Sequence, residues 1–581
     1  MDQSERGKTP VSAPGAKDSP PPVATTHPGL SSKFGVRWIF YTVVGVLTVL
    51  VPATVDLFGF RTASDATSER LLQLVAAPFY PQPGLRIGDQ YREPLPITVI
   101  LLDSAFLQST GYSWPLSYAQ HAHLIRRIAR FEPKAIFLDL YFTQKRGTER
   151  ERDLFVNELR GLTDPRNDGP RIPVFVAAPN PCSTDALGAH LVSAVQPGRG
   201  LLRSVIDVAT PVIAGWSGYG QDYPVVVAVE NLRHAEGRAG ICAPRQGEEN
   251  RMWLSAAGAL YREYCAERDS ARKDSCADLD ATPELFVDPL VILWGAEVRA
   301  EMTRFHSVAE CPLVAPRDRD RVFWILGALL KTMGDTLFST GDQAFQPCPY
   351  TETLPGSALY PYPEGENIRV GLSGGASDER DRRQIPRDVF VRDEVHEKDV
   401  ASFIKDRFVL VGTSQVGIPE VVTSPVHGDI PGVYAHAMAL DNLFRFGKHY
   451  VRNPGLFSSP LGFWKFLIES GLMLVAIVWV AGLRAASSPL GASSRISSAS
   501  TLVHWFVRAA IIGALLGGVM LGIAVALTVQ YRTSPINWLG LFAGIGVSGL
   551  VMQLARPRER TDGAAPEAVE TGPETGEGEE A

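Results

Sequence analysis

Residues 97–142 read "ITVILLDSAFLQSTGYSWPLSYAQHAHLIRRIARFEPKAIFLDLYF". The opening run, ITVILL, is continuous, apolar and β-branched, as expected for a strand that is buried on both faces of a parallel sheet. Segment 117–131 then places alanine and isoleucine at roughly helical spacing, and Pro133 ends it. Because AIFL supplies a second buried strand shortly afterwards, the stretch predicts a βαβ unit.

Later segments repeat these patterns. RIPVFVAA (171–178) and RFVLVG (407–412) are short apolar runs that predict further strands. GVYAHAMALDNLFRF (432–446) has the apolar spacing of another helix. The predicted fold class is therefore α/β, with a mainly parallel sheet built from βαβ units.

Two aspartates, Asp103 and Asp139, each follow an apolar run directly. In parallel α/β sheets, ligands bind outside the carboxyl ends of the strands. Two carboxylates at such ends would face one crevice and could hold a cation or a polar ligand. The alternative is that each carboxylate caps the turn or helix after it, which is a common use of aspartate. The residues alone leave both interpretations open.

Four apolar segments are each long enough to cross a bilayer as a helix. We expect transmembrane helices at 37–59, 463–483, 505–529 and 536–554. A signal peptide is the alternative for the first segment, and buried core helices are the alternative for the others. Basic residues cluster before the first segment, around the loop between the second and third, and after the fourth, which places both termini in the cytoplasm. Residues 60–460 would then form a periplasmic domain of a bacterial inner-membrane protein.

The two ends of the chain have the composition of disordered cytoplasmic tails. Residues 1–32 are rich in Pro, Ser, Thr and Gly, and residues 556–581 end in an acidic stretch. From Thr561 onward, seven acidic residues and no basic ones account for the whole net charge of −7. No basic footprint remains for nucleic acid, so we expect none as a partner.

All six cysteines fall between residues 60 and 460, and none forms a CxxC pair. In an oxidising compartment they could form up to three disulfides, whereas the alternative is a set of buried thiols. We expect at least one disulfide, with its partners undetermined. The candidates are Cys182, Cys242, Cys265, Cys276, Cys311 and Cys348.

The sequence gives little support for catalysis. GTSQV (412–416) lacks the final glycine of a nucleophile elbow. His427, His436 and Asp441 could form a triad on paper, but His436 lies on an apolar helix, where a packed histidine is the simpler interpretation. No HxxH or HExxH spacing is present. We therefore predict no enzyme activity, no metal and no cofactor.

Glycines at four-residue spacing occur in the third and fourth predicted membrane helices. Such spacing lets helices approach closely, either within the bundle or across a homodimer, although glycine is also common in membrane helices generally. The residues concerned are Gly513, Gly517, Gly518, Gly522, Gly540 and Gly544.

The quoted stretch, with its Trp114-Pro115 pair, His121-Ala122, Asp139 and Phe142, resembles the start of the CHASE2 family of extracytoplasmic sensor domains. The segment 403–444 is similar to the end of that domain. Its matching residues are Thr423, Pro425, Pro431, Gly432, Val433, His436 and Ala437. Between these flanks, residues 182–400 form a divergent, insertion-like middle. Three membrane helices directly after the domain are also typical of the family.

The resemblance implies a membrane-bound sensor that binds a small periplasmic ligand or a periplasmic protein. Candidate ligand-binding residues are Asp103, Ser104, Trp114, Asp139, Phe142, Thr413 and Glu420, the last standing where an aspartate is expected. Because only a short tail follows the last predicted helix, we expect a separate cytoplasmic signalling partner. The alternatives are a structural subunit that senses nothing and, third, a periplasmic metal-dependent hydrolase.

Overall fold

The fold is taken from a computed structural model. It describes residues 60–80, 95–142, 147–164, 171–178, 204–205, 207–214, 222–227, 253–266, 279, 282–296, 323, 325–327, 330, 349–360, 393–414, 421–453, 463–465, 467–469, 471, 519 and 522. Most of the four predicted membrane segments, both tails and much of the predicted divergent middle lie outside these residues.

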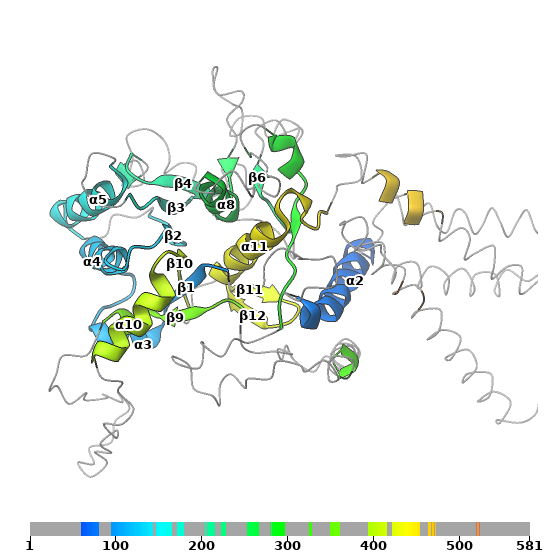
Figure 1. The fold of residues 1–581 in the computed structure, drawn as a ribbon, viewed down its shortest axis with the longest axis horizontal. Coiled ribbons are helices and arrows are strands. Elements are labelled where there is room, and N and C mark those ends of the chain that lie inside the picture. The colour runs from blue at the N-terminus through cyan, green and yellow to red at the C-terminus, as the bar shows by residue number, and fades with distance from the viewer. Residues whose placement is uncertain are drawn as a thin grey trace, which may run out of the picture.

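A six-stranded sheet in which every pairing is parallel forms the centre of the described chain (Figure 1). Its strand order is β4-β3-β2-β10-β1-β9. The strands are β1 (Ile97–Leu102), β2 (Ala135–Leu138), β3 (Val174–Ala178), β4 (Thr210–Ile213), β9 (Thr353–Pro355) and β10 (Phe408–Thr413). The α/β prediction and its parallel sheet are therefore confirmed.

The predicted βαβ unit is present, but its two strands are not neighbours. β10 lies between β1 and β2 and pairs with both, with Leu102 opposite Thr413 on one side and Leu138 opposite Val411 on the other. A strand from the end of the domain thus completes a unit begun by its first strands. Local sequence patterns cannot reveal this insertion, because it depends on pairing across about 300 residues of chain.

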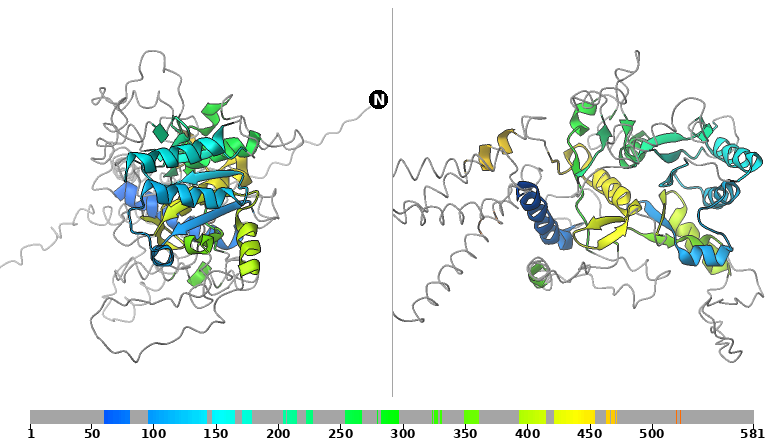
Figure 2. Two further views of the ribbon diagram at one scale, coloured as in Figure 1. Left: turned by 90° about the vertical axis from the view of Figure 1, so that its left-hand side faces the viewer. Right: turned by 180° about the vertical axis from the view of Figure 1, so that it is seen from behind.

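Helices cover both faces of the sheet, because successive residues of each buried strand point to opposite faces. One face packs against α3 (Ser104–Thr110), α4 (Tyr118–Ala129), α5 (Glu149–Thr163) and α10 (Asp393–Ile404). The other packs against α8 (Ala256–Ala266) and α11 (Val433–Phe446). Figure 2 shows α4 and α5 side by side over the sheet. Capping boxes at Ser117 and Thr148 fix the starts of these two helices.

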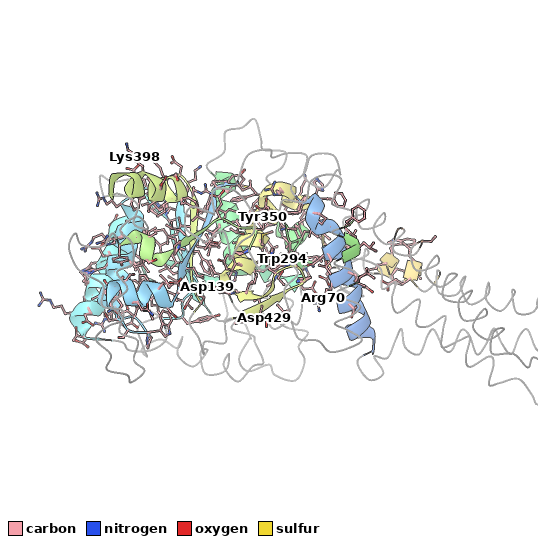
Figure 3. All side chains as sticks on the ribbon, turned by 90° about the horizontal axis from the view of Figure 1, so that it is seen from below. Arg70, Asp139, Trp294, Tyr350, Lys398 and Asp429 are labelled. Carbon is pink, nitrogen blue, oxygen red and sulfur yellow. The ribbon has the colours of Figure 1, made fainter. Side chains whose placement is uncertain are left out.

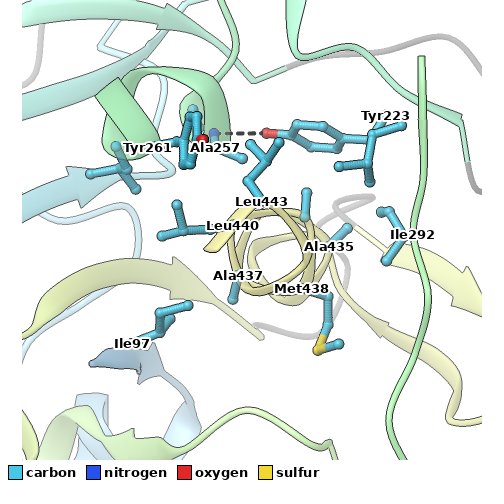
Figure 4. Packing of buried hydrophobic residues seen from close by; sticks show 14 of the residues in the cluster. Ile97, Tyr223, Ala257, Tyr261, Ile292, Ala435, Ala437, Met438, Leu440 and Leu443 are labelled. Carbon is cyan, nitrogen blue, oxygen red and sulfur yellow. Dashed lines mark hydrogen bonds between the residues drawn. The ribbon is translucent and has the colours of Figure 1, made fainter. Parts of the chain in front are cut away.

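The helix α11 lies at the centre of the second face, and all fourteen of its residues are buried (Figure 4). The sheet covers one side of it, while α8 and the segment 286–296 cover the other. Its first turn rests directly on β10 at Gly412. A Cβ atom added there would lie 2.5 Å from Cβ of Val433, so only glycine allows this approach.

The remaining elements surround α11. α2 (Phe60–Ala76) and the 3-10 turn η2 (Ala77–Phe79) precede the sheet, and the hairpin β11–β12 (Val421–Ser424, Gly428–Pro431) precedes α11. Two short antiparallel pairs, β5–β8 and β6–β7, complete this side. Their strands are β5 (Asp222–Tyr223), β6 (Val226–Val227), β7 (Trp253–Leu254) and β8 (Leu290–Val291). The other 3-10 turns are η5 (Pro283–Phe286), η7 (Gly356–Leu359) and η9 (Gly447–His449).

Of the predicted membrane helices, only residues 463–465, 467–469, 471, 519 and 522 are described, and all of these are helical. Across the described part of the chain, no helix combines the length and the apolar character that crossing a membrane requires. Among the glycines of the predicted packing motifs, Gly522 alone is described, and a Cβ atom there would meet nothing within 4 Å. The membrane spans therefore stay predictions.

Cys265, near the end of α8, is disulfide-bonded. This agrees with the expectation of at least one disulfide. The other five cysteines lie outside the described residues.

Candidate functional site

The candidate site lies at the carboxyl ends of β1, β10 and β2. Asp103 follows β1, Thr413 ends β10 and Asp139 follows β2. Since β10 separates the other two strands, the aspartates stand two strand spacings apart across the sheet, and the register sets Asp103 two residues further along than Asp139, so about 12 Å separates them. The sheet therefore places both predicted carboxylates along one edge.

Asp103 has a structural partner of its own. Its carboxylate accepts a hydrogen bond of 2.8 Å from the backbone N–H of Phe106, so it caps α3. Ser104, the first residue of that helix, is exposed. The capping alternative considered for Asp103 is thus observed. An N-cap carboxylate keeps one oxygen for other contacts, because a single N–H occupies only part of its acceptor capacity.

Asp139 belongs to a buried polar chain. Its Oδ1 lies 3.7 Å from Nε2 of His436, and Nδ1 of His436 lies 2.7 Å from the hydroxyl of Tyr223. That hydroxyl accepts a 3.1 Å hydrogen bond from the backbone N–H of Ala257, drawn in Figure 4. Asp139 lies within the body of the molecule, between Lys398 and Arg70 at opposite ends (Figure 3). This series of polar contacts joins β2, α11, β5 and α8.

The hydrogen bond between Tyr223 and His436 links the hydroxyl proton to the tautomer of the ring. A Tyr223 hydroxyl that accepts from Ala257 can donate its own proton to Nδ1, and in that arrangement the ring proton is on Nε2, facing Asp139. Burial lowers the pKa of His436 to about 3. An ion pair with Asp139 would instead raise the pKa of His436. We favour the neutral ring, because 3.7 Å exceeds hydrogen-bond distance and the ring also stacks edge-on against Phe137.

The first turn of α11 also reaches the Asp103 side of the edge. The hydroxyl of Tyr434 lies 3.0 Å from Oγ1 of Thr353, at the start of β9. Burial raises the pKa of Tyr434 to about 12; the hydrogen bond with Thr353 lowers it, and the negative charge of Asp103 raises it. Tyr434 and His436 thus connect one helical turn to the two aspartates separately.

The other predicted site residues have varied positions. Oγ1 of Thr413 donates to the carbonyl of Leu102, 3.3 Å away. Trp114 is half-buried before the cis bond to Pro115. Phe142 is buried in an aromatic cluster with Tyr118, His121 and Phe155. Glu420 lies outside the described residues.

A second polar cluster occupies the far half of α11. Asp441 pairs with Arg445, whose Nε lies 2.6 Å away, and accepts a hydrogen bond from the hydroxyl of Tyr80. Arg445 also donates to the hydroxyl of Tyr350 at 3.1 Å. Nδ2 of Asn442 donates to the Tyr80 hydroxyl at 3.1 Å. Tyr80 follows η2, so this cluster attaches the segment after α2 to α11.

Sequence reasoning missed several of these residues. Tyr223, Tyr434 and Thr353 were not expected near the aspartates, because they come from distant parts of the chain. His436 was expected to be a packed histidine with hydrogen bonds, and that is how the structure places it. The signal for the second cluster was the pair Asp441 and Arg445, four apart on one helix.

The arrangement offers few means for catalysis. The catalytic triad considered from the sequence is not formed. Nε2 of His427 lies 3.0 Å from the carbonyl oxygen of Gly295, and the carboxylate of Asp441 is bound by Arg445 and Tyr80. Burial raises the pKa of Tyr223, so its hydroxyl stays protonated. In the part of the chain that the structure describes, no group of three acidic, histidine or cysteine side chains could hold a metal.

The comparison with known families agrees with this architecture. The CHASE2 domain matches residues 46–262 and 312–482, which together are well over half of the chain. The chain therefore belongs to the CHASE2 family, whose domain is an extracytoplasmic sensor. The unmatched residues 263–311 fall inside the middle predicted to diverge. No curated protein and no solved structure matches the chain.

Proposed function

We propose that this chain is a membrane-bound, non-catalytic sensor subunit. A small extracytoplasmic ligand or a protein partner binds at the edge that bears Asp103 and Asp139. The bound state then shifts α11 and, through it, the helices that enter and leave the membrane. A separate cytoplasmic protein reads that shift. Differential affinity for two arrangements of the domain is what drives such a response.

One observation carries the proposal: α11 contacts both the candidate site and the segment after α2. Its first turn packs on Gly412 and faces the aspartates through Tyr434 and His436. Its later turns hold Tyr80, which follows α2 closely. A buried helix with contacts at both ends can transmit a small displacement, because packed cores shift between discrete arrangements rather than deform smoothly.

The test uses the intact chain in lipid nanodiscs. Thermal unfolding is measured against a panel of probes, namely Ca²⁺, Mg²⁺, amino acids, polyamines and short sugars. The double variant Asp103→Asn with Asp139→Asn removes both charges, while asparagine keeps the capping ability of Asp103. A probe that raises the Tm of the native chain should lose most of its effect in this variant.

The matched control is Asp153→Asn, an exposed carboxylate on α5. It should respond to the same probe as the native chain does. A Tm shift that the double variant retains in full would place the ligand elsewhere and contradict the proposal. Purification from native membranes supplies the second half of the test, since a kinase, cyclase or regulator should accompany the chain.

A second candidate is a structural subunit of a membrane complex. It is favoured by the local partners of both aspartates, because Asp103 caps α3 and Asp139 faces His436. A fixed assembly of constant stoichiometry, unaffected by every probe and by the double variant, would favour this function over sensing.

A further inference from the structure

The segment 288–296, with the sequence DPLVILWGA, lies inside the stretch that the family match leaves out, yet it is part of the core. Every residue from 290 to 296 is buried, although only Leu290 and Val291 form a strand, β8. Ile292 lies beside α11 in Figure 4. A buried segment with so little regular structure must find partners for its backbone groups in other parts of the chain. We refer to this segment as the strap.

One end of the strap is bonded to the chain as it enters the domain. The entry segment, residues 77–80, follows α2, and the carbonyl of Ala77 accepts a 3.2 Å hydrogen bond from the backbone N–H of Ala296. The middle of the strap is bonded to α11. Oδ1 of Asn442 accepts from the backbone N–H of Leu293 at 3.1 Å, and Nδ2 of Asn442 donates to the carbonyl of Leu293 at 3.0 Å. The strap thus fixes the entry segment relative to α11.

The other end of the strap is bonded to the chain as it leaves the domain. In the exit segment, residues 450–453, the hydroxyl of Tyr450 donates to the carbonyl of Asp288 at 2.6 Å. The backbone N–H of Val291 donates to the carbonyl of Val451 at 2.8 Å. The second predicted membrane span begins shortly after this segment. One short stretch of chain therefore holds both connections to the predicted membrane helices.

The strap also reaches the candidate site through β5, the antiparallel partner of β8. The two residues of β5 point to opposite sides of the strand. The hydroxyl of Tyr223 lies 2.7 Å from Nδ1 of His436, whose Nε2 faces Asp139. Nδ2 of Asn453, in the exit segment, donates to the carboxylate of Asp222 and lies 2.8 and 3.0 Å from its two oxygens. Two consecutive residues thus contact the candidate site and the exit segment.

We propose that the strap couples the entry and exit segments to α11, so that all three move as one unit between two arrangements of the domain. Its attachments are hydrogen bonds in a buried segment, and breaking one of them alone leaves a backbone group without a partner. Opening of the strap is therefore cooperative, as in other contiguous units that open below the free energy of global unfolding. The proposal rests on the sensing function proposed above and adds the route by which a displacement of α11 reaches both membrane connections.

Hydrogen exchange at single backbone amides tests this coupling in the full chain, in lipid nanodiscs and without any probe ligand. Fragmentation during mass spectrometry gives the rate at each amide. Val291 reports the bond to the exit segment, Leu293 the bond to α11 and Ala296 the bond to the entry segment. After correction for intrinsic exchange, we expect the three amides to open with the same equilibrium constant.

The variant Tyr450→Phe removes one bond at the exit end and keeps the ring, which stacks on Phe286. We expect all three strap amides to exchange roughly 3- to 10-fold faster, as the loss of one hydrogen bond implies. The increase should include Ala296, at the far end of the strap. The amide of Ile136, which donates to the carbonyl of Pro173 across the sheet, should keep its rate.

The matched control is Thr163→Val, which removes a hydroxyl that donates to a distant backbone carbonyl, that of Val208, at 2.9 Å on the other face of the sheet. The strap amides should keep their rates in this variant, and faster exchange there would contradict a specific coupling through Tyr450.

Three outcomes in Tyr450→Phe would overturn the coupling. Faster exchange at Val291 alone would mean that only the exit end opens. No change at any strap amide would mean that the hydroxyl does not hold the strap. Equal acceleration of Ile136 would mean that the strap opens only by global unfolding. None of these outcomes depends on whether the two aspartates bind a ligand, which the probe panel decides separately.

Discussion

At the scale of single residues, Gly412 is the position where β10 and α11 meet. Any side chain there must displace Val433, whose Cβ would lie 2.5 Å from a new Cβ. The first turn of α11 would then move away from the strand ends that bear the candidate site. One missing methyl group thus sets the distance between the sheet and the helix.

We predict that Gly412→Ala lowers the free energy of unfolding by about 1–3 kcal/mol, because overpacking a buried contact forces the backbone to shift. Denaturant unfolding of the purified chain measures this. Gly161→Ala in α5 is the matched control, since a Cβ atom there meets nothing within 4 Å. The control should be stabilised by about 0.5–1 kcal/mol, as glycine is a poor helix residue. If the two substitutions changed the free energy of unfolding equally, the close approach of Val433 to Gly412 would not be the reason that glycine is needed at position 412.

His436 makes a residue-scale prediction about pH. Its pKa is lowered to about 3 in the fold by burial, against about 6.5 in the unfolded chain. Between about pH 3 and pH 6.5, the imidazole is therefore protonated in the unfolded state and neutral in the folded state. The stability contribution is complete above about pH 6.5 and is lost progressively as the pH falls toward 3.

The expected loss from this group is about 2 kcal/mol at pH 5. Other acids titrate in the same range, so the measurement compares the native chain with His436→Gln between pH 7.5 and 5. Over that interval, the free energy of unfolding of the variant should fall by about 2 kcal/mol less than that of the native chain. Identical pH dependence would mean that folding leaves the pKa of His436 unchanged, and a larger loss in the variant than in the native chain would mean that His436 is charged in the fold and paired with Asp139.

At the scale of elements, a buried charged cluster attaches α11 to Tyr80, which follows α2 and η2. Asp441, Arg445 and Tyr80 form one cluster in which each polar group depends on the others. Removing one partner of a buried ion pair is costly, because it leaves an uncompensated charge in the interior.

We expect Arg445→Met to cost about 3–5 kcal/mol of stability, and the double variant Arg445→Met with Asp441→Leu to recover much of it. Tyr80→Phe should cost about 1.5–3 kcal/mol, since the hydroxyl donates to a carboxylate. Arg126→Met is the control, because the pair of Arg126 with Glu158 is exposed and should matter by less than about 1 kcal/mol. If the double variant were as unstable as the single one, the pair would not act as a unit.

Element positions also show what could be read from the sequence. β1, β2, β3 and β10 were predicted from apolar runs, because strands buried on both faces need them. β9 has only three residues and β4 contains a proline, so neither gave a signal. The edge position of Asp103 and Asp139 followed from the fold class. Their partners did not, because Tyr434 and His436 reach the edge only once β10 separates β1 from β2.

At the scale of the whole molecule, the two faces of the sheet serve different purposes. The face with α4, α5 and α10 forms its own apolar core. The face with α8 and α11 holds both polar clusters and the attachment of α2. Signals toward the membrane are therefore expected on the second face, and substitutions in the first core should affect stability more than response.

The disulfide of Cys265 belongs to that second face, at the end of α8. Structural disulfides persist in oxidising compartments, so the bond provides a test of where the domain lies. In native membranes, kept intact and treated with a maleimide, Cys265 should stay unlabelled until a reductant is added. Cys265→Ser should expose one newly reactive thiol and cost about 2–5 kcal/mol of stability. Labelling of Cys265 without reductant would place the domain in a reducing compartment, which would contradict an extracytoplasmic sensor and remove the reason for a signal across the membrane.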